Sequence, residues 1–340
     1  MINNKISSSQ LAVLSFLMFM APLAFIRSDD LNNNIADSVF SFITVVLITL
    51  LLSIPLFMKN VIIVENKFIS LLYSLYFVFI IVTDITAVTK MLTNTVIPDG
   101  NGIFIALSTL LIAIYGAVKG TEAVGRGADI IFPFFLLGAF FIILSALQII
   151  RPEEYVIPFE NGYEDYFDNT VLILSAVSFI PMTIILKENS NGKFTIKYII
   201  FITAALIIGL IFLLETQFCL GYYALTQQYP IYTLSAVTKA EPLKRLDLIF
   251  TVIFLMASVI RMSVSVLCLF KLAGKYSKRH TGALRIASLF FTAALTVLFL
   301  CFEETIGFQL TVYLRAAMLF IFSLPIPLII KLINKGRAAK

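Results

Sequence analysis

Residues 10–26 (QLAVLSFLMFMAPLAFI) and 171–186 (VLILSAVSFIPMTIIL) decide the fold of this chain. Both stretches are short for a membrane span, and each is interrupted by a proline, Pro22 or Pro181. A proline removes a helical hydrogen bond, so each stretch predicts a helix that is broken within the membrane. Broken segments at matching places in two halves of a membrane protein are typical of transporters and mark their binding sites. We therefore expect a small-molecule site at these two breaks.

The composition predicts an all-α integral membrane protein. The chain is 60% hydrophobic and 13% charged, with a mean hydropathy of +0.98, whereas about 25% of a soluble domain is charged. A helix of about 20 apolar residues crosses a bilayer. We predict ten spans in one transmembrane domain covering residues 1–340. They are residues 10–26, 39–58, 68–88, 103–118, 130–150, 171–186, 198–218, 248–269, 284–302 and 312–332.

Basic residues predict the orientation of these spans. With the N-terminus inside, 17 Lys and Arg residues fall in inside segments and 6 in outside loops. The excess of positive charge on the cytoplasmic side indicates that both termini are cytoplasmic. Because the basic residues sit in short loops beside the lipid bilayer, we expect no nucleic-acid partner. Five spans in each half then give two inverted pseudo-repeats, residues 8–150 and 170–333, with the first and sixth helices broken.

Two charged residues within the spans are candidates for function, because burying charge in a membrane is costly. Asp84 follows Thr83 in the third span, and Arg261 lies near the middle of the eighth span, one turn after Ser258. We predict that Asp84 and Arg261 pair or face one cavity. The alternative is that Arg261 caps backbone carbonyls and Asp84 binds water near the outer surface. Glu215, near the outer end of the seventh span, is expected to reach water.

The two breaks supply the other predicted contacts. Half-helix N-termini favour a carboxylate, and free carbonyls favour an ammonium group, so an amino acid fits both. A simple proline kink is the alternative. The predicted substrate-binding residues are Met20, Ala21, Pro22, Leu23, Thr83, Asp84, Ser178, Phe179, Ile180, Pro181, Ser258 and Arg261. No catalytic motif or ligand set for a metal or cofactor accompanies them, so we expect neither an enzyme nor a cofactor.

Several further stretches resemble the endospore germination permeases. Residues 119–133 (KGTEAVGRGADIIFP) are similar to the fourth-loop motif of that family, in which a Gly, a Glu and an Arg precede an acidic residue and a helix-starting proline. The motif positions are Gly120, Glu122, Arg126, Asp129 and Pro133. Residues 228–230 (QYP), 242–250 (PLKRLDLIF), 5–7 (KIS) with Gln10, and 151–152 (RP) also resemble the family.

The resemblance implies a member of the amino acid–polyamine–organocation superfamily. Its relatives form the B subunit of nutrient germinant receptors in the spore inner membrane, together with an A subunit and a lipoprotein C subunit. The resemblance also implies a nutrient site between the first, third, sixth and eighth helices. We therefore expect a subunit that senses a nutrient of the amino acid class and signals to its partner subunits. A proton-coupled amino acid transporter using Asp84 is one alternative, and a scaffold or ion-conducting subunit is another.

Overall fold

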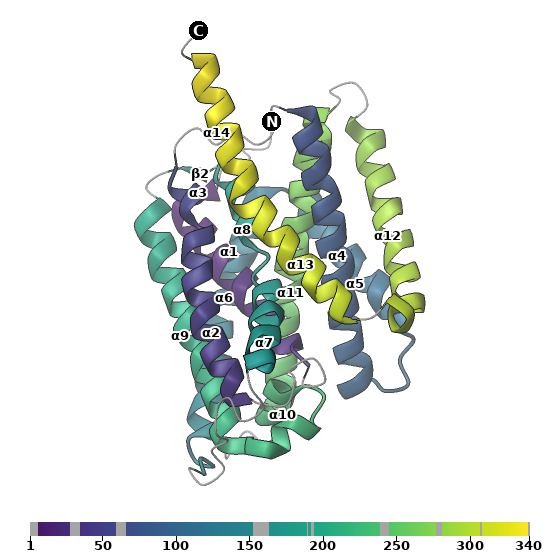
Figure 1. The fold of residues 1–340 in the computed structure, drawn as a ribbon. Coiled ribbons are helices and arrows are strands. Elements are labelled where there is room, and N and C mark those ends of the chain that lie inside the picture. Colours follow the sequence, from purple (N-terminus) through teal and green to yellow (C-terminus); the bar gives the residue numbers. More distant parts are fainter. Residues whose placement is uncertain are drawn as a thin grey trace.

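The computed structural model confirms an all-α architecture, and the residues that it describes include ten helices long and apolar enough to span a membrane. It describes residues 6–27, 35–58, 66–151, 163–188, 190–191, 194–238, 245–276, 281–306 and 308–338. Figure 1 shows the helices side by side in one bundle, with the start of α1 and the end of α14 at the same end. The inverted relation between the two halves stays a prediction.

The helices of the first half cover the first five spans. They are α1 (Ser8–Met20) with the 3-10 helix η1 (Ala21–Phe25), α2 (Ile35–Leu52) with α3 (Ile54–Phe57), α4 (Lys67–Thr95), α5 (Gly102–Lys119) and α6 (Thr121–Ala146). Gly120 alone joins α5 to α6, and its φ of 93° lies in the left-handed region that favours glycine.

The second half supplies the other five spans. They are α7 (Tyr163–Ala176) with α8 (Ile180–Lys187), α9 (Phe194–Leu220), α11 (Leu246–Tyr276), α12 (Thr281–Ile306), and α13 (Phe308–Ser323) with α14 (Pro325–Ala338). The 3-10 helix η5 (Gly221–Thr226) and the short α10 (Pro230–Val237) connect α9 to α11. The strands β1 (Ile6–Ser7) and β2 (Ser190–Asn191) pair in parallel, so the chain just before α1 lies beside the chain just after α8.

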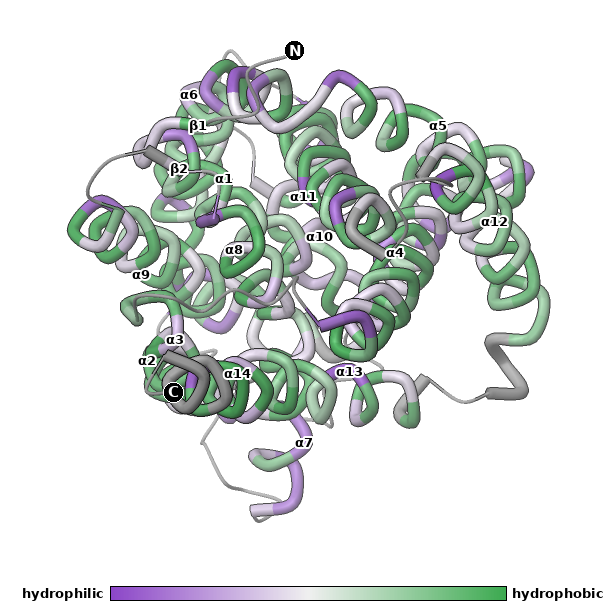
Figure 2. The backbone as a smooth tube through the Cα atoms, turned by 90° about the horizontal axis from the view of Figure 1, so that it is seen from above, coloured by the Kyte–Doolittle hydropathy of each residue, from purple (hydrophilic) through white to green (hydrophobic). Residues whose placement is uncertain are grey.

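Burial separates central from peripheral spans. In the first, sixth and eighth spans, 78%, 89% and 78% of the most apolar stretch is buried, against 11% in the ninth. Figure 2 shows α1, α8 and α11 surrounded by the other helices, with α12 at the periphery. Helices α5 and α6 approach α11 closely at glycines: a Cβ on Gly116 would lie 2.7 Å from Ser263 Oγ, and one on Gly138 2.7 Å from Ile253 Cδ1. Small residues let membrane helices pack closely in this way.

The structure corrects one prediction about the motif at residues 119–133. We expected a loop ending at a helix-starting Pro133, but α6 already begins at Thr121 and Pro133 lies inside it. Membrane helices tolerate an internal proline because neighbouring groups satisfy the backbone. The motif residue Asp129 accepts a hydrogen bond from Gln10 Nε2 (3.0 Å), which joins α6 to the start of α1. Glu122 pairs with Arg126 one turn later in α6 at 2.5 Å.

Candidate functional site

Both predicted breaks occur at their prolines, but they differ in kind. At the first, α1 ends at Met20 and the chain continues as the tighter helix η1, with Pro22 in its first turn. At the second, α7 ends at Ala176, and three turn residues precede α8, which has Pro181 in its first turn. Of these two spans, the sixth is therefore unwound, and the first changes helix type without losing its helical course.

The breaks leave backbone carbonyls that a regular helix would satisfy. Pro22 has no N–H to donate to Met18 four residues earlier. Ala176 is the last residue of α7, where carbonyls lack helical partners. A carbonyl without a donor inside a bilayer costs several kcal/mol, so a donor is required at each break.

Arg261 of α11 supplies these donors. Its Nη1 donates to the carbonyl of Met18 (2.6 Å) and to that of Ala176 (3.1 Å), while Nη2 donates to Ser178 Oγ (2.5 Å). Its Nε donates to Asp84 Oδ2 at 2.7 Å, and the side chain is 1% exposed. The predicted pairing with Asp84 and the alternative role of capping carbonyls therefore occur together. These four hydrogen bonds fix Arg261 as the link between the two breaks.

Asp84 of α4 is held between two arginines. Arg261 binds one carboxylate oxygen, and Arg315 Nη2 binds the other at 2.5 Å. Asp84 is therefore not a water-binding group near the surface. Because both of its oxygens accept from guanidinium groups, its negative charge is stabilised in the membrane interior.

Arg315 is the central residue that the sequence analysis did not place in the site. It lies in α13, and besides Asp84 it reaches Thr83 Oγ1 from Nη1 (3.2 Å) and Ser178 Oγ from Nη2 (3.0 Å). An arginine within the tenth predicted span was a signal of function. However, no pattern in the sequence indicated which helix would lie opposite it.

These residues form one buried charge cluster, defined as Asp84, Arg261, Arg315, Thr83 and Ser178. It joins α4, α11, α13 and the turn between α7 and α8, and through Met18 it also holds α1. Two arginines and one aspartate leave one excess positive charge. Tyr76 of α4 also donates to the carbonyl of Ser178 (3.1 Å), which further fixes the turn.

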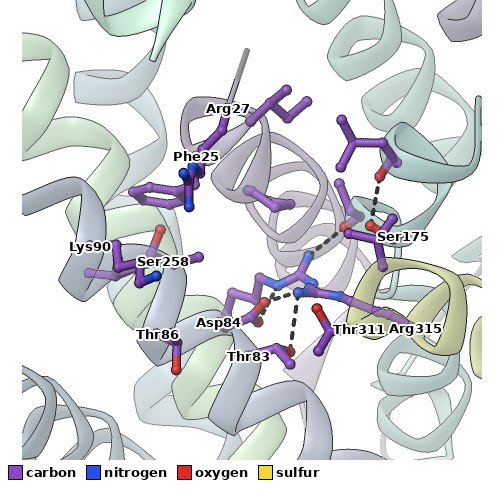
Figure 3. A pocket seen from close by; sticks show the side chains of 18 of the residues that line it. Phe25, Arg27, Thr83, Asp84, Thr86, Lys90, Ser175, Ser258, Thr311 and Arg315 are labelled. Carbon is purple, nitrogen blue, oxygen red and sulfur yellow. Dashed lines mark hydrogen bonds and ion pairs between the residues drawn. The ribbon is translucent and has the colours of Figure 1, made fainter. Parts of the chain in front are cut away.

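A cavity of about 90 Å³ lies beside this cluster. Figure 3 shows Asp84, Thr311 and Arg315 on one side of it and Phe25, Arg27 and Lys90 on the other. At this volume the cavity fits a small ligand, far below the 300–1,000 Å³ typical of drug-sized ligands.

The lining of the cavity favours an anionic group. Among the described residues, four basic side chains and one acidic side chain line it: Arg27, Lys90, Arg261, Arg315 and Asp84. Arg315 is 11% exposed, whereas Arg261 is almost completely buried, so Arg315 is the more accessible guanidinium of the cluster. Its planar donors match a carboxylate.

Hydroxyl groups supply acceptors on the same wall. Thr86, Ser175 and Ser258 line the cavity, and each donates to a carbonyl of its own helix, at 2.9, 2.7 and 2.8 Å. A hydroxyl that donates to its own helix keeps lone pairs for another donor. These oxygens can accept from an ammonium group. The sequence predicted free carbonyls at the breaks for this purpose, but the carbonyls of Met18 and Ala176 accept hydrogen bonds from Arg261 instead.

The predicted substrate-binding residues divide into two groups. Pro22, Thr83, Asp84, Ser258 and Arg261 line the cavity, and Ser178 lies next to it in the charge cluster. The other six are buried and are absent from the cavity wall: Met20, Ala21, Leu23, Phe179, Ile180 and Pro181. Phe179 packs edge-on against Phe19, with ring centroids 6.0 Å apart, so it joins α1 to the sixth span.

Glu215 does not reach water as predicted. It is 4% exposed, and neither carboxylate oxygen has a hydrogen-bond partner among the described residues. The C-terminal end of α9 is covered because η5 and α10 fold back on it, with Leu220, Ala224 and Leu234 in one small apolar cluster. The connection after α9, read from the sequence as an outer loop, thus seals this end of the helix.

Replacing Glu215 by Gln should preserve or raise the unfolding midpoint of the purified protein. An ionised carboxylate buried without a partner is costly, and the neutral amide removes that charge at nearly the same shape. Midpoints of Glu215→Gln and of the wild type, measured in detergent, test this. A fall of several degrees in Glu215→Gln would show that the carboxylate has a stabilising partner.

The fold and the site together define a multi-pass membrane protein with a small cavity lined by basic side chains at its broken helices. Residues 66–305, more than two thirds of the chain, match the family model described as spore germination protein. The chain belongs to this family, which confirms the resemblance seen in its motifs, and it is a multi-pass inner-membrane protein of spore germination. No curated protein matches it in sequence.

Proposed function

We propose that this protein is the nutrient-binding subunit of a spore germinant receptor and that it holds a small amino acid in the cavity beside Arg315. The observation that carries the proposal is the cavity itself, which lies at the helix breaks and whose described wall has four basic side chains and one acidic side chain. The ligand carboxylate binds Arg315, and its ammonium group binds the hydroxyl oxygens of Thr86, Ser175 and Ser258.

Ligand binding changes the ion pair that joins α4 to α13. A carboxylate at Arg315 competes with Asp84 for the same guanidinium group. In the structure, Arg315 Nη2 lies 2.5 Å from Asp84 Oδ1, and this ion pair joins the two helices. A ligand shifts a conformational equilibrium only if it binds two states with different affinities. Release of Asp84 from Arg315 supplies that difference, and receptor A and C subunits read the resulting movement of the last span.

Replacing Arg315 by Gln should weaken amino acid binding about 10- to 100-fold, since a hydrogen bond to a charged group contributes about 1.5–3 kcal/mol. Equilibrium binding of labelled amino acids to the purified protein measures this. Arg151→Gln is the matched control, because Arg151 is exposed and does not line the cavity. Equal affinity in a folded Arg315→Gln variant would remove Arg315 from the ligand site.

A proton-coupled amino acid transporter remains the second candidate, with a different proton site. Asp84 is fully engaged by two arginines, whereas Glu215 is a buried carboxyl group whose oxygens have no hydrogen-bond partner among the described residues. A proton carrier needs to bind and release its proton, and an engaged carboxylate is poorly suited to this. The second candidate therefore moves the coupling role from Asp84 to Glu215.

Uptake into proteoliposomes separates the two candidates. For a receptor we expect saturable binding of an amino acid without accumulation, with or without a proton gradient, and co-purification with A-type and C-type subunits. Accumulation that requires the gradient and is lost in Glu215→Gln would establish the transporter instead.

A further inference from the structure

A second pocket lies far from the ligand cavity, at the end of the bundle where α1 begins. The end of α5, the start of α6, the last turns of α11 and the first turns of α12 surround a groove of about 650 Å³. It is several times larger than the ligand cavity, and neither the proposed function nor the family motif at residues 119–133 explains it.

The groove is basic on three helices. Lys119 of α5, Lys271 of α11 and Arg285 of α12 line it, and no acidic side chain is among the described residues of its wall. The nearby Glu122 is paired with Arg126. Lys119 Nζ lies 5.2 Å from the ring centre of Tyr115, and Arg285 Cζ 5.5 Å from that of Phe270, so aromatic rings help to position both exposed cations.

Apolar side chains continue from the groove along the outside of the bundle. Val118 is 63% exposed and Ile286 57% exposed at the groove, with Tyr115 and Phe290 one turn further into the span. In a membrane-spanning chain these side chains face acyl chains. A basic head site and an apolar wall in one groove therefore match a molecule with an anionic head and hydrocarbon tails.

We propose that this groove binds an anionic phospholipid, with its phosphate at Lys119 and Arg285 and its acyl chains along α5 and α12. Basic pockets between membrane helices hold such head groups, and each basic side chain contributes about a fivefold gain in affinity. The lipid has a structural role here, because α12 belongs to the least buried span and the groove lies between it and α5 and α11.

Helix α12 connects the lipid site to the ligand cavity. Arg285, Ile286 and Leu289 of this helix line the groove, and Phe299 of the same helix lines the cavity. Lipid that holds the start of α12 against α5 and α11 therefore also restrains the helix that carries Phe299.

The test compares two double variants of equal charge change in the full-length protein. Lys119→Gln with Arg285→Gln removes the two exposed groove cations, while Lys67→Gln with Lys197→Gln removes exposed basic residues at the starts of α4 and α9. Native mass spectrometry and the unfolding midpoint are measured with added phosphatidylglycerol, phosphatidylcholine or inorganic phosphate. Amino acid binding by each variant is measured separately.

We expect wild type and the control variant to retain phosphatidylglycerol and to be stabilised by it, and the groove variant to bind it about 30-fold more weakly. Phosphatidylcholine and inorganic phosphate should have little effect. Equal retention by the two double variants would overturn the proposal, as would equal stabilisation by inorganic phosphate or by phosphatidylcholine. Loss of amino acid binding in Arg315→Gln with lipid retention intact would show that the two sites are separate.

Discussion

Replacing Asp84 by Asn should destabilise the folded protein by about 3–5 kcal/mol, the cost of leaving buried charges without their partner. Two guanidinium groups, from Arg261 and Arg315, lie against this carboxylate, and the arginine side chains are 1% and 11% exposed. The amide keeps the shape but removes the only negative charge of the cluster. The unfolding midpoint is measurable with a thiol-reactive dye, because Cys268 is a free, fully buried cysteine.

The double variant Asp84→Asn with Arg315→Gln is the control for this prediction. It removes one negative and one positive charge, so the excess charge of the cluster is the same as in the wild type. Its stability should lie above that of Asp84→Asn alone. Wild-type stability in Asp84→Asn would mean that water enters the cluster and screens the arginines.

Replacing Arg261 by Met should also destabilise the protein by about 3–5 kcal/mol, for a different reason. The change leaves the carbonyls of Met18 and Ala176 without their donor at both helix breaks, and it removes one partner of Asp84. Methionine fills much of the volume of the arginine side chain. The loss of stability therefore measures the missing polar contacts and not the cost of an empty cavity. The yield of monodisperse protein and its unfolding midpoint measure the effect.

Arg315→Met is the matched comparison, since it removes from the same cluster a guanidinium group whose described hydrogen bonds go to the side chains of Thr83, Asp84 and Ser178. We expect Arg315→Met to lose less stability than Arg261→Met and to lose more ligand affinity. The reverse order in stability would mean that the helix breaks hold their carbonyls without Arg261, and that Arg261 is free to act as the ligand contact.

Hydropathy was sufficient to predict ten spans, because the length of an apolar stretch depends only on local sequence. It was also sufficient to single out Asp84 and Arg261, since charges inside spans are rare. The ends of helices were harder to predict. Helix α11 continues to Tyr276 and not to residue 269, and the tenth span is divided at Pro325, a break that the hydropathy pattern did not indicate.

Contacts between distant helices could not be read from local sequence. Arg315 was visible as a charge in the tenth span, but its approach to Asp84 depends on how α13 packs beside α4 and α7. Glu215 was misjudged for the same reason, because α10 covers the end of α9 only in the folded chain. The error at Pro133 had a local cause, since a proline that can start a helix is also tolerated inside a membrane helix.

The position of Arg315 in the last span has a consequence for biogenesis. Chains are synthesised from the N-terminus, so Asp84 and Arg261 enter the membrane before Arg315 is made. Until then α4 and α11 share a single ion pair, and the turn at Ser178 lacks the hydrogen bonds from Arg315. A chain that ends before α13 therefore cannot complete the charge cluster that joins α4, α11 and the turn at Ser178.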